Sequence, residues 1–371
     1  MEDYERGSHE GTERIHAHRR HIESHIDETL EDRGACAAVT VGEAQTPVVQ
    51  YCLSALEDHP THDQTQVVAL GYDGTEWAVF GDNGAHPATA LGDALVDQYG
   101  ERTVLTPATI PHDAALHLEA AGLTLASSDV CDRARAVKTA RERPSIETAQ
   151  VAAREGLQRG AAIIAGATVT DGCLERDGTP VTAQSLRVAI DEAIVSAGGF
   201  PAGNSTVKQG QAQTPTQALE PGEPLTVIVQ PRGPAGYYGR LIRTFVVDSD
   251  GGRERRAHVA LTQAFRSSQS MLTAGPESIR AVEADLEAEI RAFGEDGEIE
   301  TRVAGIGLEP AERPRAGADS IEPGSLVCLE AAVELADGQW LRLADVLAKE
   351  EEGVSWIGAP SRSLEPAALL E

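Results

Sequence analysis

Up to residue 130, short apolar runs alternate with longer amphipathic segments. Apolar runs bounded by polar turns predict strands at 35–41, 48–53, 103–105 and 123–126. Helical periodicity predicts helices at 11–33, 88–99 and 112–121. Asp73-Gly74 separates two β-rich runs and predicts a hairpin over 66–80. This alternation of strands and helices indicates an α/β domain.

The pattern changes after an arginine-rich polar stretch at 130–144, where we expect the domain boundary. Pro144-Ser145 predicts the start of a long helix, with Ser145 as its N-cap. The apolar stripe of this helix is Ile146, Ala149, Ala153 and Leu157. Further helices are predicted at 183–197, 255–274 and 277–293. Strands are predicted at 225–230, 236–247, 325–335, 339–348 and 354–357. Helices mixed with long antiparallel strands favour an α+β second domain.

One short motif occurs twice in this second part. Leu219-Glu220-Pro221-Gly222 and Ile321-Glu322-Pro323-Gly324 each lead into a predicted strand. A Pro-Gly turn before a strand is common, so the motif alone is weak. Because a pair of helices precedes each copy, it predicts that the second domain consists of two related halves.

Length and charge exclude several classes of protein. The 371 residues suffice for two domains. Acidic residues outnumber basic ones by 59 to 31, which gives a formal net charge of −28. This charge argues against nucleic acid and anionic membranes as partners, because phosphate binding needs clustered Lys and Arg. Only Lys138, Lys208 and Lys349 are lysines. An acidic, lysine-poor composition is typical of proteins from salt-rich cells, where salt screens repulsion between the acidic groups.

Neither disulfides nor a membrane segment is expected. The five cysteines include no CxxC pair, which argues against a disulfide framework and a zinc ribbon. The N-terminal residues Met1–Glu5 lack the basic and apolar regions of a signal peptide. No apolar run approaches the ~18 residues of a membrane-spanning helix. We therefore expect a reduced, cytoplasmic, soluble protein.

Histidines are concentrated in the N-terminal helical segment, at His9, His16, His18, His21 and His25. The pairs His18/His21 and His21/His25 have a spacing that places both rings on one helix face, where they could ligate a metal. An exposed polar helix face is the simpler interpretation, because no HExxH arrangement accompanies them. GxSxG, GxxxxGK[ST] and GxGxxG are all absent from the sequence, so hydrolase-elbow, P-loop and Rossmann sites have no support.

Several motifs in the second half follow one another in a familiar order. The most specific are Gly236-Tyr237 with Ile242-Arg243-Thr244-Phe245, Gly305-Ile306-Gly307-Leu308-Glu309, and Glu322-Pro323-Gly324. In this order and spacing they resemble the pita-bread peptidases, which include creatinase, methionine aminopeptidase, Xaa-Pro aminopeptidase and prolidase. Arg133 to Lys138 resembles that family's link between its N-terminal and catalytic domains, so the resemblance covers about 36–358.

This resemblance implies an α/β N-terminal domain followed by an α+β pita-bread domain. The boundaries that it implies are an N-terminal helical segment 1–35, a creatinase-type domain 36–130, a linker 131–144, a pita-bread domain 145–358 and a tail 359–371.

The resemblance also implies a binuclear metal site, but most of its ligands are missing. The family's two aspartates, one histidine and two glutamates fall at Val229 or Gln230, Arg240, Ala304, Glu330 and Ala344. Of these positions only Glu330 carries a carboxylate, and two adjacent divalent ions need several oxygen donors. We therefore predict no bound metal, no cofactor and no catalytic residues.

Two further family histidines are also absent. One falls at Ala311 and the other near Lys208 or Gln209. The metal-free creatinase branch depends on a histidine early in this domain, and none lies between His117 and His258. His258 itself is expected on a helix surface.

The sequence makes a specific structural prediction at the former metal site. Arg240 should form a direct ion pair with Glu330, because an arginine fork is well shaped to satisfy a buried carboxylate. Arg342 should reach the same cavity, since it lies two residues before Ala344 on one strand. Two arginines against one glutamate would leave positive charge for an anionic ligand. The candidate cleft-binding residues are therefore Lys208, Arg240, Glu330 and Arg342.

Three hypotheses for function remain from the sequence. The favoured one is a catalytically inactive homologue that binds a peptide, a small acid or a partner protein through the former cleft, with a homodimer as one assembly. The second is an active Xaa-Pro peptidase or a metal-free amidohydrolase. The third is a structural subunit that pairs with an active paralogue.

Overall fold

The computed structural model describes residues 2–56, 66–210, 214–249, 251–335 and 338–371. Its internal contacts divide the chain into two compact units, the first ending at Arg141 and the second beginning at Glu142. Each unit has a sheet and its own apolar cores, and each is described by itself below.

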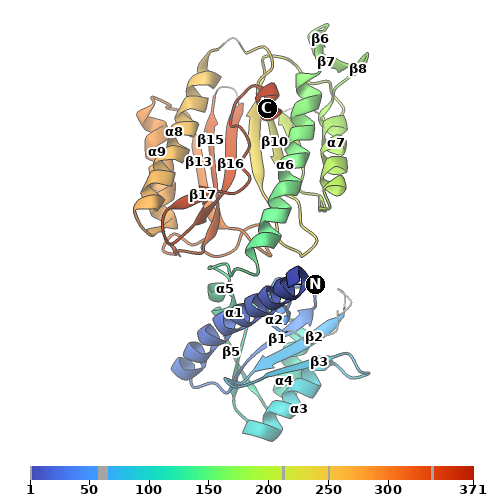
Figure 1. The fold of residues 1–371 in the computed structure, drawn as a ribbon, viewed down its shortest axis with the longest axis vertical. Helices are drawn as coiled ribbons and strands as arrows, with labels where there is room; N and C mark the ends of the chain where they lie inside the picture. Colours follow the sequence, from blue (N-terminus) through green and yellow to red (C-terminus); the bar gives the residue numbers. More distant parts are fainter. Residues whose placement is uncertain (1, 57–65, 211–213, 250, 336–337) are drawn as a thin grey trace. The chain divides into compact units, whose positions relative to one another are not determined.

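The first unit is built on a five-stranded mixed sheet in the order β3-β2-β1-β4-β5 (Figure 1). Its strands are β1 Ala37–Glu43, β2 Val67–Tyr72, β3 Trp77–Gly81, β4 Thr103–Thr106 and β5 Thr124–Ser127. Its helices are α1 Glu2–Arg33, α2 Pro47–Leu53, α3 Pro87–Tyr99, α4 His112–Ala120 and α5 Val130–Ala134. Apolar side chains from α3 and α4 pack with β1, β2 and β4 in one core, and α2 packs with β2 in another. The sheet therefore has apolar contacts on both faces, as expected for an α/β unit.

The second unit contains a seven-stranded antiparallel sheet among the described residues. Its linear order is β13-β15-β16-β11-β10-β9, and β17 also pairs with β16. The strands are β9 Thr206–Gln209, β10 Leu225–Val229, β11 Leu241–Phe245, β13 Ile299–Gly305, β15 Leu326–Glu334, β16 Trp340–Lys349 and β17 Val354–Trp356. The helices are α6 Arg143–Ala165, α7 Ala183–Ser196, α8 Arg253–Ala274 and α9 Ile279–Ala292. Small elements at its periphery are β6 Thr168–Thr170, β7 Cys173–Arg176, β8 Thr179–Pro180, β12 Glu277–Ser278, β14 Ser320–Ile321 and the 3-10 helix Pro366–Leu369.

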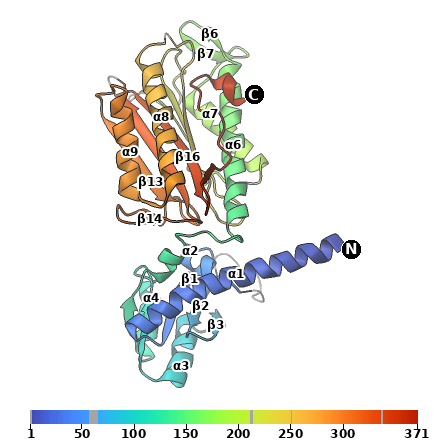
Figure 2. The same ribbon diagram turned by 60° about the vertical axis from the view of Figure 1, so that its left-hand side comes forward.

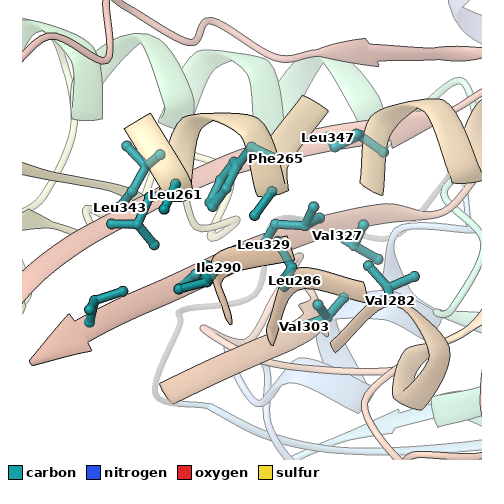
Figure 3. Packing of buried hydrophobic residues seen from close by; sticks show 14 of the residues in the cluster. Leu261, Phe265, Val282, Leu286, Ile290, Val303, Val327, Leu329, Leu343 and Leu347 are labelled. Carbon is teal, nitrogen blue, oxygen red and sulfur yellow. The ribbon is translucent and has the colours of Figure 1, made fainter. Parts of the chain in front are cut away.

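The two helix pairs cover one face of this sheet and bury two apolar cores. Helices α8 and α9 pack on β13, β15 and β16 (Figure 2), and Figure 3 shows Phe265 and Leu286 near Leu329 and Leu261 near Leu343. Helices α6 and α7 pack on β10 and β11 through a second cluster. Each half of the unit thus supplies a helix pair and antiparallel strands, which is consistent with the two related halves that the repeated motif predicts.

The opposite face of the sheet, called the site face below, carries the residues that the sequence singled out. Successive side chains of a strand point to opposite faces of the sheet, so the residues that alternate with core residues point to the site face. Residues that are paired across neighbouring strands point to the same face. The register pairs Arg302 with Glu330, Glu330 with Ala344, and Ala344 with Ile242.

Three secondary-structure predictions are wrong. Residues 48–53 form part of helix α2, because Pro47 starts a helical turn and Val49 and Cys52, three residues apart, share its buried side. Helix α6 begins at Arg143 with Glu142 as N-cap, so Ser145 lies inside the first turn. The strand predicted at 236–247 is confined to Leu241–Phe245.

The segments at the two ends and at the boundary are more structured than their predicted names suggest. Ile22, Ile26 and Leu30 of α1 are buried in the first unit. The expected linker 131–144 contains most of α5 and the start of α6. The expected tail 359–371 packs on the second unit, where Leu369 joins the α6–α7 core.

Candidate functional site

Arg240 forms an ion pair with Glu330 on the site face. The Arg240 Nη2 atom lies 2.5 Å from Glu330 Oε2, and the two side chains are 15% and 14% exposed. Arg240 Nη1 donates to Gln230 Oε1 at 2.8 Å. The predicted pair is confirmed. The guanidinium thus joins two positions at which the resemblance places metal-ligating carboxylates.

The backbone of Arg240 is held by a residue that sequence reasoning missed. Gln150, fully buried on α6, accepts from the Arg240 backbone N–H at 2.8 Å and donates to its carbonyl at 3.1 Å. Two hydrogen bonds to one peptide position orient Arg240 just before β11 begins. The available signal was a polar residue inside an otherwise apolar helix stripe, which is expected only where it satisfies a partner.

The alternation of side chains along β10 decides whether Val229 or Gln230 stands at the position of the family's first aspartate. Val229 is the last residue of β10 and packs in the core on the helix side. Gln230 follows it, points to the site face and also donates to the Pro310 carbonyl at 3.3 Å. Gln230 is therefore the residue that stands at the site.

Arg342 reaches the same region, where it pairs with an acidic residue that the sequence did not predict. Its Nη1 atom lies 2.7 Å from Glu300 Oε2 and 3.9 Å from Glu330 Oε1. Its guanidinium also lies over the Trp340 ring, 4.9 Å from the centroid. The predicted excess of positive charge does not come from Arg342, because Glu300 on β13, two strands away from β16, balances it. Arg302, which pairs with Glu330 in the sheet register, is the second arginine at the ion pair.

A small cavity of about 60 Å³ adjoins the ion pair, with room for a few water molecules. Its lining residues are Gln230, Arg240, Arg302, Ala304, Pro310, Ala311, Cys328 and Glu330. Burial raises the pKa of Cys328 to about 12, so its thiol stays protonated near neutral pH. Ala304, Ala311 and Ala344 supply no side-chain donor at the positions where the resemblance places ligands or substrate contacts.

This donor set does not fit a pair of divalent metal ions. Glu330 is already neutralised by Arg240, and Gln230 Oε1 accepts from the same guanidinium. Within the described ranges, no three His, Cys, Asp or Glu side chains are grouped so that they could hold a metal ion. A cation would have to displace Arg240 and would then find one carboxylate and one amide oxygen.

A larger cavity of about 840 Å³ lies beside the edge strand β9. Lys208 on β9 and Arg342 on β16 both line it, together with Trp340. Gln209, the alternative position for the lost histidine, is buried and hydrogen-bonds the Glu220 backbone and the Glu223 carbonyl. Both residues line the cavity, and Lys208 is the one of the pair that lies on the site face.

The matched glycine motif has a packing role. A Cβ atom at Gly305 would collide with the Arg313 carbonyl, and one at Gly307 would collide with the Glu312 carboxylate. These glycines allow the segment that contains Pro310 and Ala311 to lie directly against the end of β13.

Arg243 and Asp345, both matched in the sequence, form a buried ion pair on the helix side of the sheet. Arg243 Nη2 lies 2.6 Å from Asp345 Oδ1, and Arg362 Nε lies 2.6 Å from Asp345 Oδ2. Burial lowers the pKa of the Arg243 guanidinium, and the Asp345 carboxylate opposes that effect. Their location away from the site face indicates a structural role.

His18, His21 and His25 are hydrogen-bonded within the first unit, and no metal-ligand cluster is found there among the described residues. His18 is fully buried, with ring nitrogens 2.9 Å from Thr139 Oγ1 and Ser54 Oγ. His21 bonds the Ala134 carbonyl, and His25 bonds the His21 carbonyl. His16 is exposed and His9 lies in the same helix. The exposed polar face expected here is thus partly a packing face.

His258, expected on a helix surface, is half-buried on α8 and bonds the Arg362 carbonyl. Burial lowers the pKa of its imidazole. It lies on the helix side of the sheet and takes no part in the site.

Comparison with solved structures identifies the architecture. The chain superposes on the prolidase of Pyrococcus horikoshii with a TM-score of 0.72 at 15% identity, covering 92% of this chain and 99% of that one. The chain has a prolidase-like fold. The X-Pro aminopeptidase of Thermotoga maritima gives a TM-score of 0.72 at 12% identity, over 89% and 97% of the two chains. The Xaa-Pro dipeptidase of Bacillus anthracis gives 0.72 at 14% identity, over 95% and 99%.

These structural similarities establish the fold. No protein-family model matches the chain, and no curated protein is a significant sequence match. The predicted arrangement, an α/β domain followed by an α+β pita-bread domain, is confirmed. No helix in the described ranges is long and apolar enough to cross a membrane.

Proposed function

We propose that this prolidase-fold protein does not hydrolyse peptides and instead binds a small acid, a peptide or a partner protein through its site face. The main support is that the Arg240 guanidinium hydrogen-bonds both Gln230 and Glu330, which stand at positions where the resemblance places metal-ligating carboxylates.

The residues around Arg240 and Glu330 offer no activated nucleophile for peptide hydrolysis. Peptide hydrolysis in a metal-dependent site needs a water whose pKa a bound ion lowers. Here the remaining carboxylate is neutralised by an arginine, which cannot be deprotonated to act as a base. The Cys328 thiol, which lines the small cavity, is kept protonated by burial, so it offers no thiolate.

Binding is supported by the space and the groups that remain. The site face offers a cavity of about 840 Å³, within the range of ~300–1,000 Å³ that is typical of small-molecule sites. Charged and aromatic side chains line it, including Lys208, Trp340 and Arg342.

The test is a turnover assay on dipeptides with proline in the second position. The protein is incubated with glycyl-proline and Mn²⁺, and free proline is quantified by chromatography. We expect no release of proline beyond that of a Glu330→Gln variant purified in parallel. Proline release that the chelator EDTA and the Glu330→Gln substitution both abolish would show hydrolysis at this site and overturn the proposal.

A further inference from the structure

The cavity beside β9 is lined by strands of the site face and by the start of helix α7. Lys208, Thr226, Ile228 and Trp340 all lie on the site face, because Lys208 pairs with Thr226 in the sheet register and the others alternate with core residues. Arg342, two residues after Trp340, lines the same cavity.

The charges around this cavity are unusual for so acidic a chain. The described lining includes Arg187, Lys208 and Arg342 but no Asp or Glu, although the chain has a net charge of −28. Arg187 pairs with Asp191 at 2.9 Å, and Arg342 pairs with Glu300 at 2.7 Å. Lys208 is exposed, and its side chain forms no ion pair or hydrogen bond with any described residue, although its backbone pairs with Thr226 in the sheet. Among the described residues, the positive charge of Lys208 therefore has no counter-ion at the cavity.

The remaining lining is suited to an apolar group. Ile228, Val207 and Pro224 contribute aliphatic surface, and the half-buried Trp340 contributes an aromatic ring. Ser205, another lining residue, is buried and its hydroxyl has no hydrogen-bond partner within the described ranges. In the described lining, a cation without a counter-ion, a hydroxyl without a partner and apolar walls together favour an amphipathic anion.

We propose that this cavity binds a small organic monocarboxylate with an aromatic or aliphatic body, its carboxylate at Lys208 and its body against Trp340 and Ile228. This inference rests on the proposed binding function and names the ligand class. It also moves the binding centre from the Arg240–Glu330 pair to the β9 side of the site face.

A carboxylate is favoured over a phosphate ester by charge. A carboxylate brings one negative charge, which Lys208 balances, whereas a phosphomonoester brings about 1.5 to 2 at neutral pH. The two nearby arginines already have acidic partners, so the second charge of a phosphate would stay uncompensated in a strongly acidic protein.

The test is isothermal titration calorimetry with hippurate (N-benzoylglycine) as the probe and its neutral amide, hippuramide, as the matched ligand. The full chain is titrated at one KCl concentration at which its thermal transition is cooperative. Lys208→Gln removes the charge, Lys208→Arg retains it, and the control Arg291→Gln removes a paired cation on α9 that does not line the cavity. Phenyl phosphate is titrated as the competing ligand chemistry.

We expect hippurate to bind saturably and hippuramide at least about tenfold more weakly, as for loss of one charged hydrogen bond. Lys208→Gln should weaken hippurate binding by about the same factor, and Lys208→Arg and Arg291→Gln should bind hippurate within about threefold of wild type. Absence of hippurate binding, equal binding of hippuramide, tighter binding of phenyl phosphate, or indifference to Lys208→Gln would each overturn the assignment.

Failure here is distinguishable from failure of the proposed function. Hippurate binding that is lost in Arg240→Gln but kept in Lys208→Gln would place the ligand at the ion pair, which refutes this inference and leaves the binding function standing. Metal-dependent proline release would refute the binding function whatever the hippurate result.

Discussion

Breaking the Arg240–Glu330 pair should destabilise the second unit through the charge that remains. Glu330→Gln keeps the shape of the side chain and removes its charge, so Arg240 is left with Gln230 as its side-chain partner. Arg240→Gln leaves Glu330 with Arg342, whose nearest nitrogen is 3.9 Å away. The double variant removes both charges and should recover part of the loss.

The magnitude follows from the burial of the two groups. Removing one partner of a fully buried pair costs about 3–5 kcal/mol. Here the side chains are 15% and 14% exposed and each keeps a second partner, so the expectation falls below that range. We expect each single variant to lose about 2–3 kcal/mol of unfolding free energy, with a coupling energy of about 1–3 kcal/mol in the double-mutant cycle.

The assay is urea unfolding at constant KCl, followed by tryptophan fluorescence in a Trp77→Phe background. Trp77 lies in the first unit, and Trp340 and Trp356 lie in the second, so the signal then reports the second unit alone. The matched control is the exposed pair Arg291–Glu287 on α9, which has an N–O distance of 3.1 Å. Its cycle should give a coupling energy of about 0.5 kcal/mol or less.

A coupling energy for Arg240 and Glu330 no larger than that of the control would refute the reasoning. It would mean that the two groups do not form a desolvated pair in solution. Additive losses of the two single variants would carry the same meaning.

Three further predictions concern stability. Burial lowers the pKa of His18 from 6.5 to about 4, so between these pH values the unfolded state binds a proton that the folded state does not bind. The unfolding free energy should therefore fall by up to about 3 kcal/mol as the pH is lowered from 6.5 to 4. In urea unfolding followed by circular dichroism, His18→Gln should show a smaller dependence of the unfolding free energy on pH. Asp345→Asn should leave Arg243 buried without its counter-charge and cost about 3–5 kcal/mol, measured by the same method. With a net charge of −28, the melting temperature should rise from low to molar KCl, and a flat or falling value would contradict the charge argument.

The sequence predicted the fold well where periodicity was long or motifs were specific. The long helices and the central strands of the second unit follow their apolar patterns, and the motif order anticipated the architecture over both units. Residues 48–53 were misread because a six-residue apolar run fits a strand or a short helix equally well. Only the packing of Val49 and Cys52 on one side distinguishes the two.

At the site, the pairing of Arg240 with Glu330 was predictable, and the further partners of the site residues were not. Arg240 and Glu330 could be paired because strand alternation and the family spacing together place them on one face. Glu300 was missed because β13 was not predicted as a strand, and Gln150 was missed because it reaches the site from helix α6, whose position depends on tertiary packing. The same limit applied to His18, whose partners Ser54 and Thr139 are far away in the sequence.

Metal stoichiometry tests most directly the claim that an arginine–glutamate pair has replaced the metal site. The protein is incubated with Mn²⁺ or Co²⁺, dialysed, and analysed for bound metal by plasma mass spectrometry. The Arg240–Glu330 pair predicts no stoichiometric Mn, Co, Zn or Fe. About one or two bound ions per chain that are lost in Glu330→Gln would contradict the claim. Such a result would indicate a metal-dependent hydrolase.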